Sequence, residues 1–478
     1  MKGARIGVLV VSVAALLGAA TLVVGQQGAP GAQVRWSEES RGKILAGIIV
    51  ETLTVSPDSK RVAYVASKGE KQLVVVDGQQ GPEYDDIMEG TPIFSPDSRR
   101  VAYAAHKGDK WMVVVDGQEG PLYDSIGEGT LTFSPDSQRL AYAAKKGEWL
   151  ALLDELAKWV VVVDGQEGRE YDAICSLIFF SPDSQRVAYV PWKGEKQLVV
   201  VDGQEGREYE YDGIGKGTPI FSPDSQHVAY APRKGDKRLV VVDGQEGPEY
   251  DDIEGLWFSL SSKRVAYGAQ KGDKWMVVVD GQEGREYDAI RSLIFFSPDS
   301  QRVAYVHWKG EKHWVVVDGQ EGPEYDGIRS LIFSPDSQHV AYAPRKGDKR
   351  LVVVDGQQGP QYLGIAALTF SPDSQRVAYA AKKGDKWLMV VDGQQGLEYD
   401  GIGPPGPIFS PDSQRVAYAA KKGHKWLMVV DAQEGPEYDE FLRGSKLAFD
   451  DERHVHDLAR RGRVRGEALL VKGEIVGP

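Results

Sequence analysis

The chain has 478 residues, of which 41% are hydrophobic, so it is long enough for several ordinary domains and can form a packed core. Its formal net charge of −13 argues against a general nucleic-acid binder, because such proteins carry a basic surface. Cys175 is the only cysteine, which excludes an internal disulfide and a zinc site built from several cysteines.

The N-terminus differs in character from the rest of the chain. Lys2 and Arg5 precede residues 6–24, which contain no charged side chain. This pattern is typical of an export signal, and the run is also just long enough for an uncleaved anchor. We assign residues 1–25 to a signal peptide or membrane anchor. We expect an exported protein that is periplasmic, secreted, or anchored to the outer side of the cytoplasmic membrane. The following Gly-, Gln- and Ala-rich sequence indicates a flexible spacer over residues 26–43.

Residues 44–478 are dominated by one recurring phrase, F-S-P-D-S-Q-R-V-A-Y. Successive copies lie 37 to 41 residues apart, except for 47 between the third and the fourth. A period near 40 indicates an array of supersecondary units that must stack to bury their apolar faces. The copies begin at Ser56, Ser95, Ser134, Ser181, Ser222, Ser259 (degraded), Ser297, Ser334, Ser371 and Ser410.

In the copy around Ser95 the unit divides into four short segments joined by turns. Residues 91–94 are apolar, residues 101–105 alternate like a strand, and residues 111–115 form a β-branched run suited to a central strand. Ser-Pro-Asp-Ser and Asp-Gly are tight-turn sequences, and a fourth, edge-like strand begins at Leu122. Four antiparallel strands per unit, repeated radially, predict an all-β propeller of about ten to eleven four-stranded blades. Ten of the 21 tyrosines fall in second strands and ten in fourth strands, which indicates packing between blades.

The phrase resembles the WD-like repeat of TolB-type propellers, whose blades carry an F-S-P-D-G-K-R-I-A-F-like motif. Here a serine replaces the usual glycine after the aspartate, as at Ser59, Ser137 and Ser184. The resemblance covers roughly residues 44–475 and implies a β-propeller, but it is unspecific for function. The Gly-His and Trp-Asp marks of true WD repeats are missing, and the α/β domain of TolB has no counterpart.

The chain is expected to enter and leave within a blade. Residues 44–49 precede the first Ser-Pro turn in the position of a fourth strand, and three short segments after residue 446 look like an eleventh, degraded blade: residues 447–449, 454–459 and 468–471. This predicts one ring closed by both chain ends. Two abutting rings of five and six blades, or an open superhelical array, are the alternatives.

No catalytic motif is present in the sequence, and the expected protein is non-enzymatic and has no cofactor or metal. Residues 454–457, His-Val-His-Asp, could touch a metal ion but fit a surface strand better. Blade geometry places the Asp-rich turns on one face of the ring and the Lys-Gly-Asp-Lys loops on the other. The first face would then be acidic, unless aspartate is there only as a turn former.

The residues around the lysine loops vary from blade to blade, and Trp, His and Arg, the types that anchor interfaces, recur among them. Drift at unconstrained positions explains the variation equally well. The candidate binding residues from these loops are Trp192, Arg233, Trp308, His313 and Arg345.

One blade carries an insertion, residues 149–157, between its second and third strands. Trp149, Leu152, Leu153 and Leu156 follow the spacing of an amphipathic helix, which predicts a short helix there. Its apolar face either packs on the ring or docks a partner.

These features favour an exported scaffold that binds a protein or peptide. The alternatives are a glycan-binding module of the cell envelope, with loop tryptophans as stacking platforms, and a propeller enzyme whose site lies on an acidic face. No nucleic-acid partner is expected, and membrane contact is expected only through the N-terminal segment.

Overall fold

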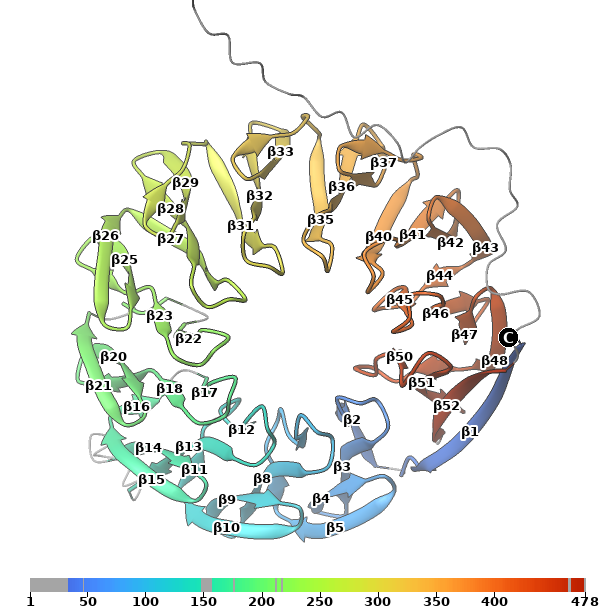
Figure 1. The fold of residues 1–478 in the computed structure, drawn as a ribbon. Coiled ribbons are helices and arrows are strands. Elements are labelled where there is room, and N and C mark those ends of the chain that lie inside the picture. Colours follow the sequence, from blue (N-terminus) through green and yellow to red (C-terminus); the bar gives the residue numbers. More distant parts are fainter. Residues whose placement is uncertain are drawn as a thin grey trace, which may run out of the picture.

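The computed structural model describes residues 33–45, 47–147, 157–174, 177–210, 213–215, 218–462 and 466–476. All regular structure within these ranges is β-strand, in 11 antiparallel sheets that follow one another around a single ring (Figure 1). The predicted all-β propeller is therefore confirmed, with eleven blades in one closed ring instead of two rings or an open array. The described residues contain no helix that could span a membrane. Segment 1–25 and the insertion that carries Trp149, Leu152, Leu153 and Leu156 lie outside them.

Each blade runs from a first strand near the ring centre to a fourth strand on the rim (Figure 1). The first strands, several of them in two pieces, are β2 (Ile48–Val55), β6 (Asp86–Ile87) and β7 (Ile93–Phe94), β11 (Ser125–Ile126) and β12 (Thr132–Phe133), β16 (Ala173–Ile174) and β17 (Phe179–Phe180), β22 (Ile220–Phe221), β27 (Asp252–Phe258), β31 (Ala289–Phe296), β35 (Gly327–Phe333), β40 (Gly364–Phe370), β44 (Gly401–Ile402) and β45 (Ile408–Phe409), β49 (Glu440–Phe441) and β50 (Ala448–Phe449). The second strands are β3 (Val62–Lys68), β8 (Val101–Lys107), β13 (Leu140–Lys146), β18 (Val187–Tyr189) and β19 (Pro191–Lys193), β23 (Val228–Tyr230) and β24 (Arg233–Lys234), β28 (Val265–Lys271), β32 (Val303–Lys309), β36 (Val340–Lys346), β41 (Val377–Lys383), β46 (Val416–Lys422) and β51 (His454–Arg461).

The remaining two strands of each blade form its outer half. The third strands are β4 (Lys71–Val76), β9 (Lys110–Val115), β14 (Lys158–Val163), β20 (Lys196–Val201), β25 (Lys237–Val242), β29 (Lys274–Val279), β33 (Lys312–Val317), β37 (Lys349–Arg350) and β38 (Val353–Val354), β42 (Lys386–Val391), β47 (Lys425–Val430) and β52 (Glu467–Val476). The fourth strands are β5 (Gln79–Tyr84), β10 (Gln118–Tyr123), β15 (Gln166–Tyr171), β21 (Gln204–Tyr209), β26 (Gln245–Tyr250), β30 (Gln282–Glu283), β34 (Gln320–Glu321), β39 (Gln357–Gln358), β43 (Gln394–Tyr399), β48 (Gln433–Tyr438) and β1 (Gln33–Lys43). We number the blades 1 to 11 from the one that begins with β2.

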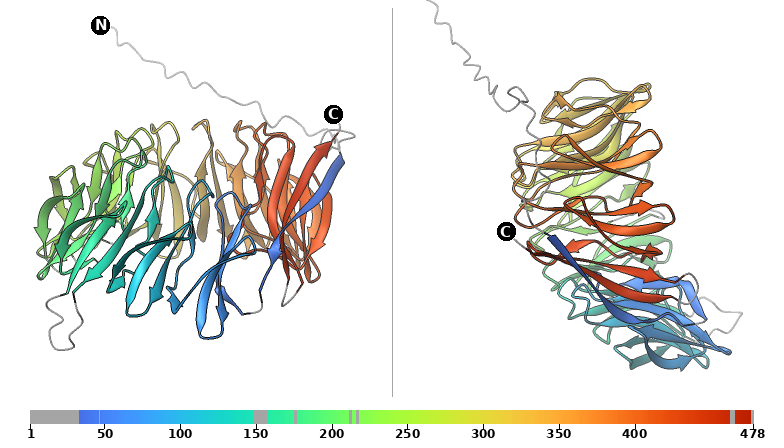
Figure 2. Two further views of the ribbon diagram at one scale, coloured as in Figure 1. Left: turned by 90° about the horizontal axis from the view of Figure 1, so that it is seen from below. Right: turned by 90° about the vertical axis from the view of Figure 1, so that its right-hand side faces the viewer.

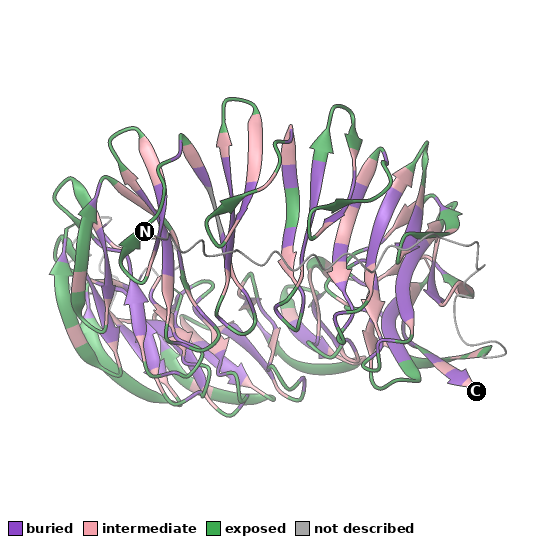
Figure 3. Ribbon diagram, turned by 45° about the horizontal axis from the view of Figure 1, so that its top comes forward, coloured by how far each residue is buried: buried purple, intermediate pink, exposed green. Residues whose placement is uncertain are grey.

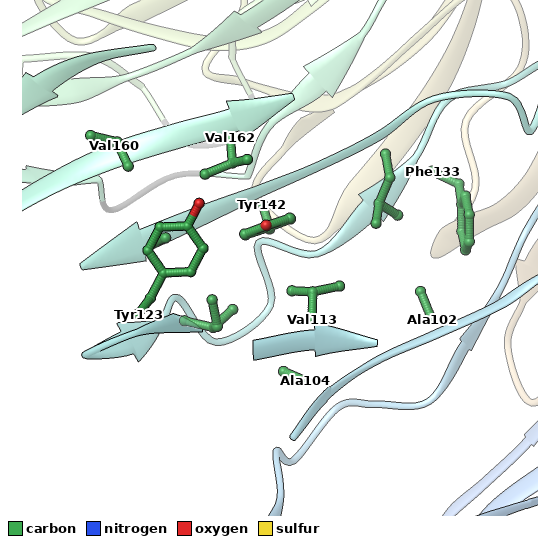
Figure 4. Close-up of a cluster of buried hydrophobic side chains, with 11 residues drawn as sticks. Ala102, Ala104, Val113, Tyr123, Phe133, Tyr142, Val160 and Val162 are labelled. Atoms are coloured by element: carbon green, nitrogen blue, oxygen red, sulfur yellow. The ribbon is translucent and has the colours of Figure 1, made fainter. Parts of the chain in front are cut away.

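The hydrophobic core is divided among the seams between blades. In the seam of Figure 4, Val113 and Tyr123 of blade 2 pack against Phe133, Tyr142 and other apolar side chains of blade 3. The rings of Tyr123 and Tyr142 meet edge to face, with centroids 6.1 Å apart and planes at 74°. Equivalent tyrosine pairs recur around the ring, so the prediction that the tyrosines pack between blades is confirmed. The middles of the strands are buried, whereas the turns are exposed (Figure 3).

A second seam contact explains why serine replaces glycine in the repeated phrase. Ser137 has a φ of 66°, in the left-handed region that favours glycine, and is 1% exposed. Its hydroxyl accepts a hydrogen bond from the backbone N–H of Asp97 in the preceding blade, at 2.9 Å. A glycine would adopt this φ without strain but could not accept the bond. Eight further seams have the same contact: Asp58–Ser98, Asp136–Ser184, Asp183–Ser225, Asp224–Ser262, Ser261–Ser300, Asp299–Ser337, Asp336–Ser374 and Asp373–Ser413.

The arginine of the phrase joins its own blade to the next one. Arg100 pairs with Asp116 of the Asp-Gly turn at 3.1 Å and donates to the carbonyl of Ser137 at 3.2 Å. Its guanidinium also lies over the ring of Phe133 in the next blade, 5.3 Å from the centroid. In blades 5 and 8 a histidine, His227 or His339, takes the place of this arginine and bonds the equivalent aspartate.

Strand β1 closes the ring by pairing antiparallel with β52, from Gln33 opposite Val476 to Lys43 opposite Glu467 (Figures 1 and 2). Closure by both chain ends is confirmed, but two boundaries are corrected. Residues 33–43 form the closing strand and not a spacer, and Ile48 and Ile49 belong to β2, the first strand of blade 1, and not to a fourth strand. The closing strand was missed because it is an outer strand with a largely polar face, and its few apolar side chains gave a weaker signal than the run after Lys43.

The seam between blades 10 and 11, which β1 completes, uses contacts of its own. The indole of Trp36 fits where Gly435 and Gly473 lack side chains, since a Cβ atom at either glycine would lie 2.9 or 3.0 Å from it. Tyr438 donates to Glu38 at 2.6 Å, and the hydrogen bond from Arg461 holds the pKa of Glu38 below its usual value.

Blade 11 also buries two polar side chains at successive positions of strand β51, so they lie on opposite faces of its sheet. His456 bonds the carboxylate of Asp450 at 3.0 Å and the carbonyl oxygen of Asp58 in blade 1 at 2.7 Å. Asp457 is 3% exposed, and burial raises the pKa of its carboxyl to about 6. A raised carboxyl pKa means that the folded state prefers the protonated form.

We predict that Ser137→Ala lowers the free energy of unfolding by about 1–2 kcal/mol, because the hydrogen bond is lost while the positive φ remains. Ser137→Gly removes the same bond but relieves the strained φ, so we expect a cost about 1 kcal/mol smaller. Chemical denaturation of the two variants measures the difference. Equal losses of unfolding free energy in the two variants would show that the positive φ causes no strain at this position.

Deleting residues 1–43 should expose the edge of β52 and cause self-association and a lower melting temperature. A chain that begins at residue 33 keeps the closing strand and is the matched control. Light scattering and thermal melts compare the two. If the chain that begins at residue 44 stays monomeric with an unchanged melting temperature, β1 is not needed for closure.

Asp457 should make the protein less stable as pH rises from about 4 to about 7. The folded-state pKa of about 6 lies above the ordinary value of 3.8, so the folded state holds the extra proton between these values and loses that advantage above them. Asp457→Asn should therefore be more stable than the parent by about 1–3 kcal/mol at pH 7.5 and nearly equal to it near pH 4. Denaturation curves at several pH values measure this difference, and a difference independent of pH would contradict the assignment.

Candidate binding site on the lysine-loop side of the ring

We call the side that carries the turns between second and third strands the lysine-loop side. We call the residues that stay the same from blade to blade the frame. The lysines of this side form ion pairs with acidic residues of the frame. In blade 2, Lys107 contacts Glu119 at 3.0 Å and Lys110 contacts Asp124. The aspartates that end the fourth strands also bind the next blade, since Asp85 accepts from the N–H of Gly108 at 2.8 Å. The repeated lysines thus hold blades together and leave little unpaired charge for a partner.

The opposite side is also largely neutralised, because the aspartates of the Asp-Gly turns pair with the arginines of the repeated phrase. An uncompensated acidic face, which the turn sequences alone predict, is therefore not formed by these carboxylates. The alternative explanation applies: aspartate serves the turn. Asp116 has a φ of 51° followed by Gly117 at 80°, the geometry of a tight two-residue hairpin.

The variable residues occupy one structural position in ten of the blades. They form a single cross-strand pair between the second and third strands, directly inside the pair of loop lysines. The pairs are Ser67–Gln72, His106–Trp111, Lys145–Trp159, Trp192–Gln197, Arg233–Arg238, Gln270–Trp275, Trp308–His313, Arg345–Arg350, Lys382–Trp387 and Lys421–Trp426.

Several of these pairs serve the frame. The side-chain oxygens of Gln72 and Gln197 accept the backbone N–H of the following blade's first strand, at 3.0 and 3.1 Å. The rings of His106 and Trp111 stack on one another with centroids 4.9 Å apart. Variation at this position is therefore partly a matter of how each seam is filled.

One seam gathers the variable residues into an open cleft. Between blades 7 and 8, a cavity of about 340 Å³ is lined by Trp308, His313, Arg345, Arg350 and Arg329, together with Asp326, Gly327 and Ile328. Three of the predicted binding residues, Trp308, His313 and Arg345, thus meet at one site. Trp192 and Arg233 occupy the same pair position in blades 4 and 5 and do not line this cleft.

Hydrogen bonds from the frame hold the cleft's residues in place. Arg345 lies opposite Arg350 in the sheet and donates to the backbone carbonyl of Asp326 at 2.7 Å. The carboxylate of Asp326 is used by the frame, because it pairs with Lys312 at 2.8 Å and accepts from Gly347 at 2.6 Å.

The other wall is aromatic. The rings of Trp308 and His313 stack across their strand pair, with centroids 6.0 Å apart and planes at 29°. Both side chains are half-buried, so they form a firm apolar surface at the edge of the charged cleft.

The cleft is strongly electropositive. Burial and the neighbouring charges of Arg329 and Arg345 lower the pKa of Arg350. Among the described residues, none of these three arginines forms an ion pair with a carboxylate, whereas most arginines of the frame do. Three guanidinium groups thus share one small volume with a single lining carboxylate, that of Asp326, which is also paired with Lys312 and interacts with Arg345.

Blade 5 contains the same arginine pair in a different setting. Arg238, the equivalent of Arg350, pairs with Asp252 of the next blade at 3.1 Å. The adjoining cavity, of about 660 Å³, is lined by two carboxylates, those of Asp252 and Glu254, against this one arginine. The same local sequence therefore produces a compensated site in blade 5 and a cationic one in blade 8.

The metal hypothesis for residues 454–457 has no structural support. The described part of the chain contains no group of three or more His, Cys, Asp or Glu side chains arranged to hold a metal ion. His454 instead bonds Asp451 at 2.8 Å, and His456 bonds Asp450 and faces blade 1.

The sequence reasoning missed Arg329, which lies in the first strand of blade 8 and not near a loop. A signal was available, because the linker Y-D-G-I-G before blade 5 becomes Y-D-G-I-R before blade 8.

No protein-family model and no curated protein matches this chain. Similar solved structures include a eukaryotic initiation factor, with 15% identity, 72% of this chain and 96% of that chain covered, and a TM-score of 0.38. TolB from Acinetobacter baumannii is 13% identical over 60% of this chain and 80% of its own, with a TM-score of 0.25. A putative TolB from Agrobacterium tumefaciens is 9% identical over 49% and 94%, also at 0.25. With every TM-score below 0.5, these similarities carry nothing about function. The assignment as a β-propeller, of the kind that TolB-like repeats form, stands on the blades of this chain.

Proposed function

We propose that the protein is an exported, non-enzymatic β-propeller that binds a protein or peptide partner on the lysine-loop side of its ring. The observation that carries this proposal is the cleft between blades 7 and 8. There, Trp308, His313 and Arg345 converge with two further arginines that the frame does not neutralise. Trp308, His313 and Arg350 are half-buried and Arg345 is exposed at the rim, and aromatic and arginine side chains are the residues that dominate binding energy at protein interfaces.

The constant and the variable residues of the repeat have different roles, which supports a binding function. The constant residues make the seams, turns and ion pairs, so they are not available for a ligand. The cross-strand pair differs in chemistry from blade to blade while its backbone position stays the same. A rigid frame that presents different side chains at equivalent positions suits recognition of an extended partner.

A peptide fits the cleft better than a neutral glycan does. Three arginines beside one carboxylate that is already paired with Lys312 favour a ligand that brings negative charge, whereas a neutral sugar brings none. Export rests on residues 1–25 alone, in which a basic start precedes an apolar run.

Selection from a linear peptide library with the purified chain tests the proposal. We expect enriched peptides whose binding falls about tenfold or more in the double variant Trp308→Ala, Arg345→Gln, because anchor residues of this kind contribute more than about 1 kcal/mol each. Leu397→Ala, at an exposed position on the outer strand β43, is the control and should leave binding unchanged.

Two results would contradict this function. One is the absence of any enriched peptide. The other is enrichment of peptides whose affinity is the same for the parent and the double variant. A glycan array probed in parallel would favour the envelope-module alternative if it gave hits that depend on Trp308.

A further inference from the structure

The chain contains an internal comparison that isolates what is special about blade 8. Residues 221–245 and 333–357 are identical, so blades 5 and 8 share their second and third strands and the arginine pair between them. The differences that matter lie in the flanking first strands. Arg329 precedes blade 8 where Gly215 precedes blade 5, and Gly364 follows blade 8 where Asp252 follows blade 5.

Each difference leaves more positive charge on the arginines of blade 8. Arg329 adds a third guanidinium to the cleft. Gly364, in the first strand of blade 9 and outside the cleft lining, lacks the carboxylate with which Asp252 pairs the equivalent arginine of blade 5. Counting the arginine pair and these two positions, the site has three positive charges in blade 8. The equivalent site in blade 5 has two arginines and one aspartate, a net charge of +1. The two substitutions act in the same direction and on the same side chains.

This arrangement is costly in the free protein and is relieved by an anion. Like charges within one cleft repel each other, and partial burial limits how far water screens them. Guanidinium groups bind phosphate and carboxylate oxygens in bidentate pairs, so a ligand with several such oxygens can engage more than one arginine at once. The stacked rings of Trp308 and His313 offer an apolar wall for the carbon atoms that carry the anion.

We propose that the cleft between blades 7 and 8 binds a multiply charged oxyanion group on a partner peptide: a phosphoryl group or two neighbouring carboxylates. The inference rests on the proposed function, that the lysine-loop side binds a peptide, and names the chemistry of the ligand. Arg350 lies deepest and is held opposite Arg345, while Arg329 and Arg345 are exposed at the rim. The anion thus enters between the two exposed arginines and contacts the third.

Calorimetric titration of the full chain with three synthetic peptides tests the inference. The peptides have the same length and differ at the centre, which is phosphoserine, Glu-Glu or Gln-Gln. We expect at least one anionic peptide to bind at least about tenfold more tightly than the neutral one. Which anionic peptide binds best distinguishes a phosphoryl ligand from an acidic sequence. Inorganic phosphate should compete, and added salt should weaken binding.

The matched variant converts the blade 8 site into the blade 5 site. Arg329→Gly with Gly364→Asp should reduce the affinity for the anionic peptide about tenfold or more, with an unchanged melting temperature. A Cβ at Gly364 would meet Lys382 at 3.3 Å and Trp387 at 3.4 Å, so the new side chain needs only small adjustments. Arg350→Lys keeps the positive charge but loses the planar guanidinium that can bind an oxyanion through two N–H groups, so we expect an intermediate loss of affinity. Leu397→Ala, on the outer strand β43, is the control and should change nothing.

The outcomes separate this inference from the proposed function. If library peptides bind the lysine-loop side but the anionic peptides bind no better than the neutral one, the inference is wrong and the proposed function stands. If anionic peptides bind equally to the parent and to the converted variant, the anion lies elsewhere and the inference is also wrong. If the converted variant melts at a lower temperature, Arg345→Gln alone decides, and unchanged affinity in that variant overturns the proposal.

Discussion

The hydrogen bond from an aspartate N–H of one blade to a serine hydroxyl of the next is the contact on which the ring depends. It requires a serine at positive φ, as at Ser137. The turn is therefore strained at this residue, but the serine hydroxyl lies at the seam and accepts the hydrogen bond. Because the same bond recurs at nine seams, with Ser261 in place of the aspartate at one of them, successive blades are set at nearly the same step. The arginine that crosses to the next blade's phenylalanine reinforces that step. A repeated step of fixed size leads to a closed ring when the ends of the chain can meet.

Residues outside the repeated phrase close the ring. The final seam has no tyrosine pair of the usual kind, and Trp36, Glu38 and Arg461 take its place around the pairing of β1 with β52. Blade 11 also contributes His456, which reaches the carbonyl of Asp58 in blade 1. Trp36 and Glu38 contact blade 10 and His456 contacts blade 1, so residues outside the repeat hold blade 11 on both sides. The buried carboxyl of Asp457, whose pKa is raised by burial, is a further feature specific to this blade.

The contacts made by the repeated residues also limit which positions can bind a ligand. Lysines, aspartates and arginines of the repeat neutralise each other across strands and seams, which leaves one cross-strand pair per blade free to vary. Blades 5 and 8 show that even this pair does not decide the chemistry by itself. Arg238 pairs with Asp252 in one blade, whereas no described carboxylate forms an ion pair with Arg350 in the other, because the first strand of the next blade supplies an aspartate in the first case and Gly364 in the second.

The sequence by itself determined the strand count of each blade, the turn types, the packing role of the tyrosines and the degraded eleventh blade, since periodicity and turn chemistry are local properties. It also singled out Trp308, His313 and Arg345 by their variation on a constant frame. Only the tertiary structure decided that there is one ring, that residues 33–43 close it, and that these three residues share a cleft with Arg329 and Arg350. Those facts depend on which strands become neighbours across a seam. A polar outer strand such as β1 and an arginine in a first strand have no periodic signal of their own, and their partners lie a blade or a whole chain length away.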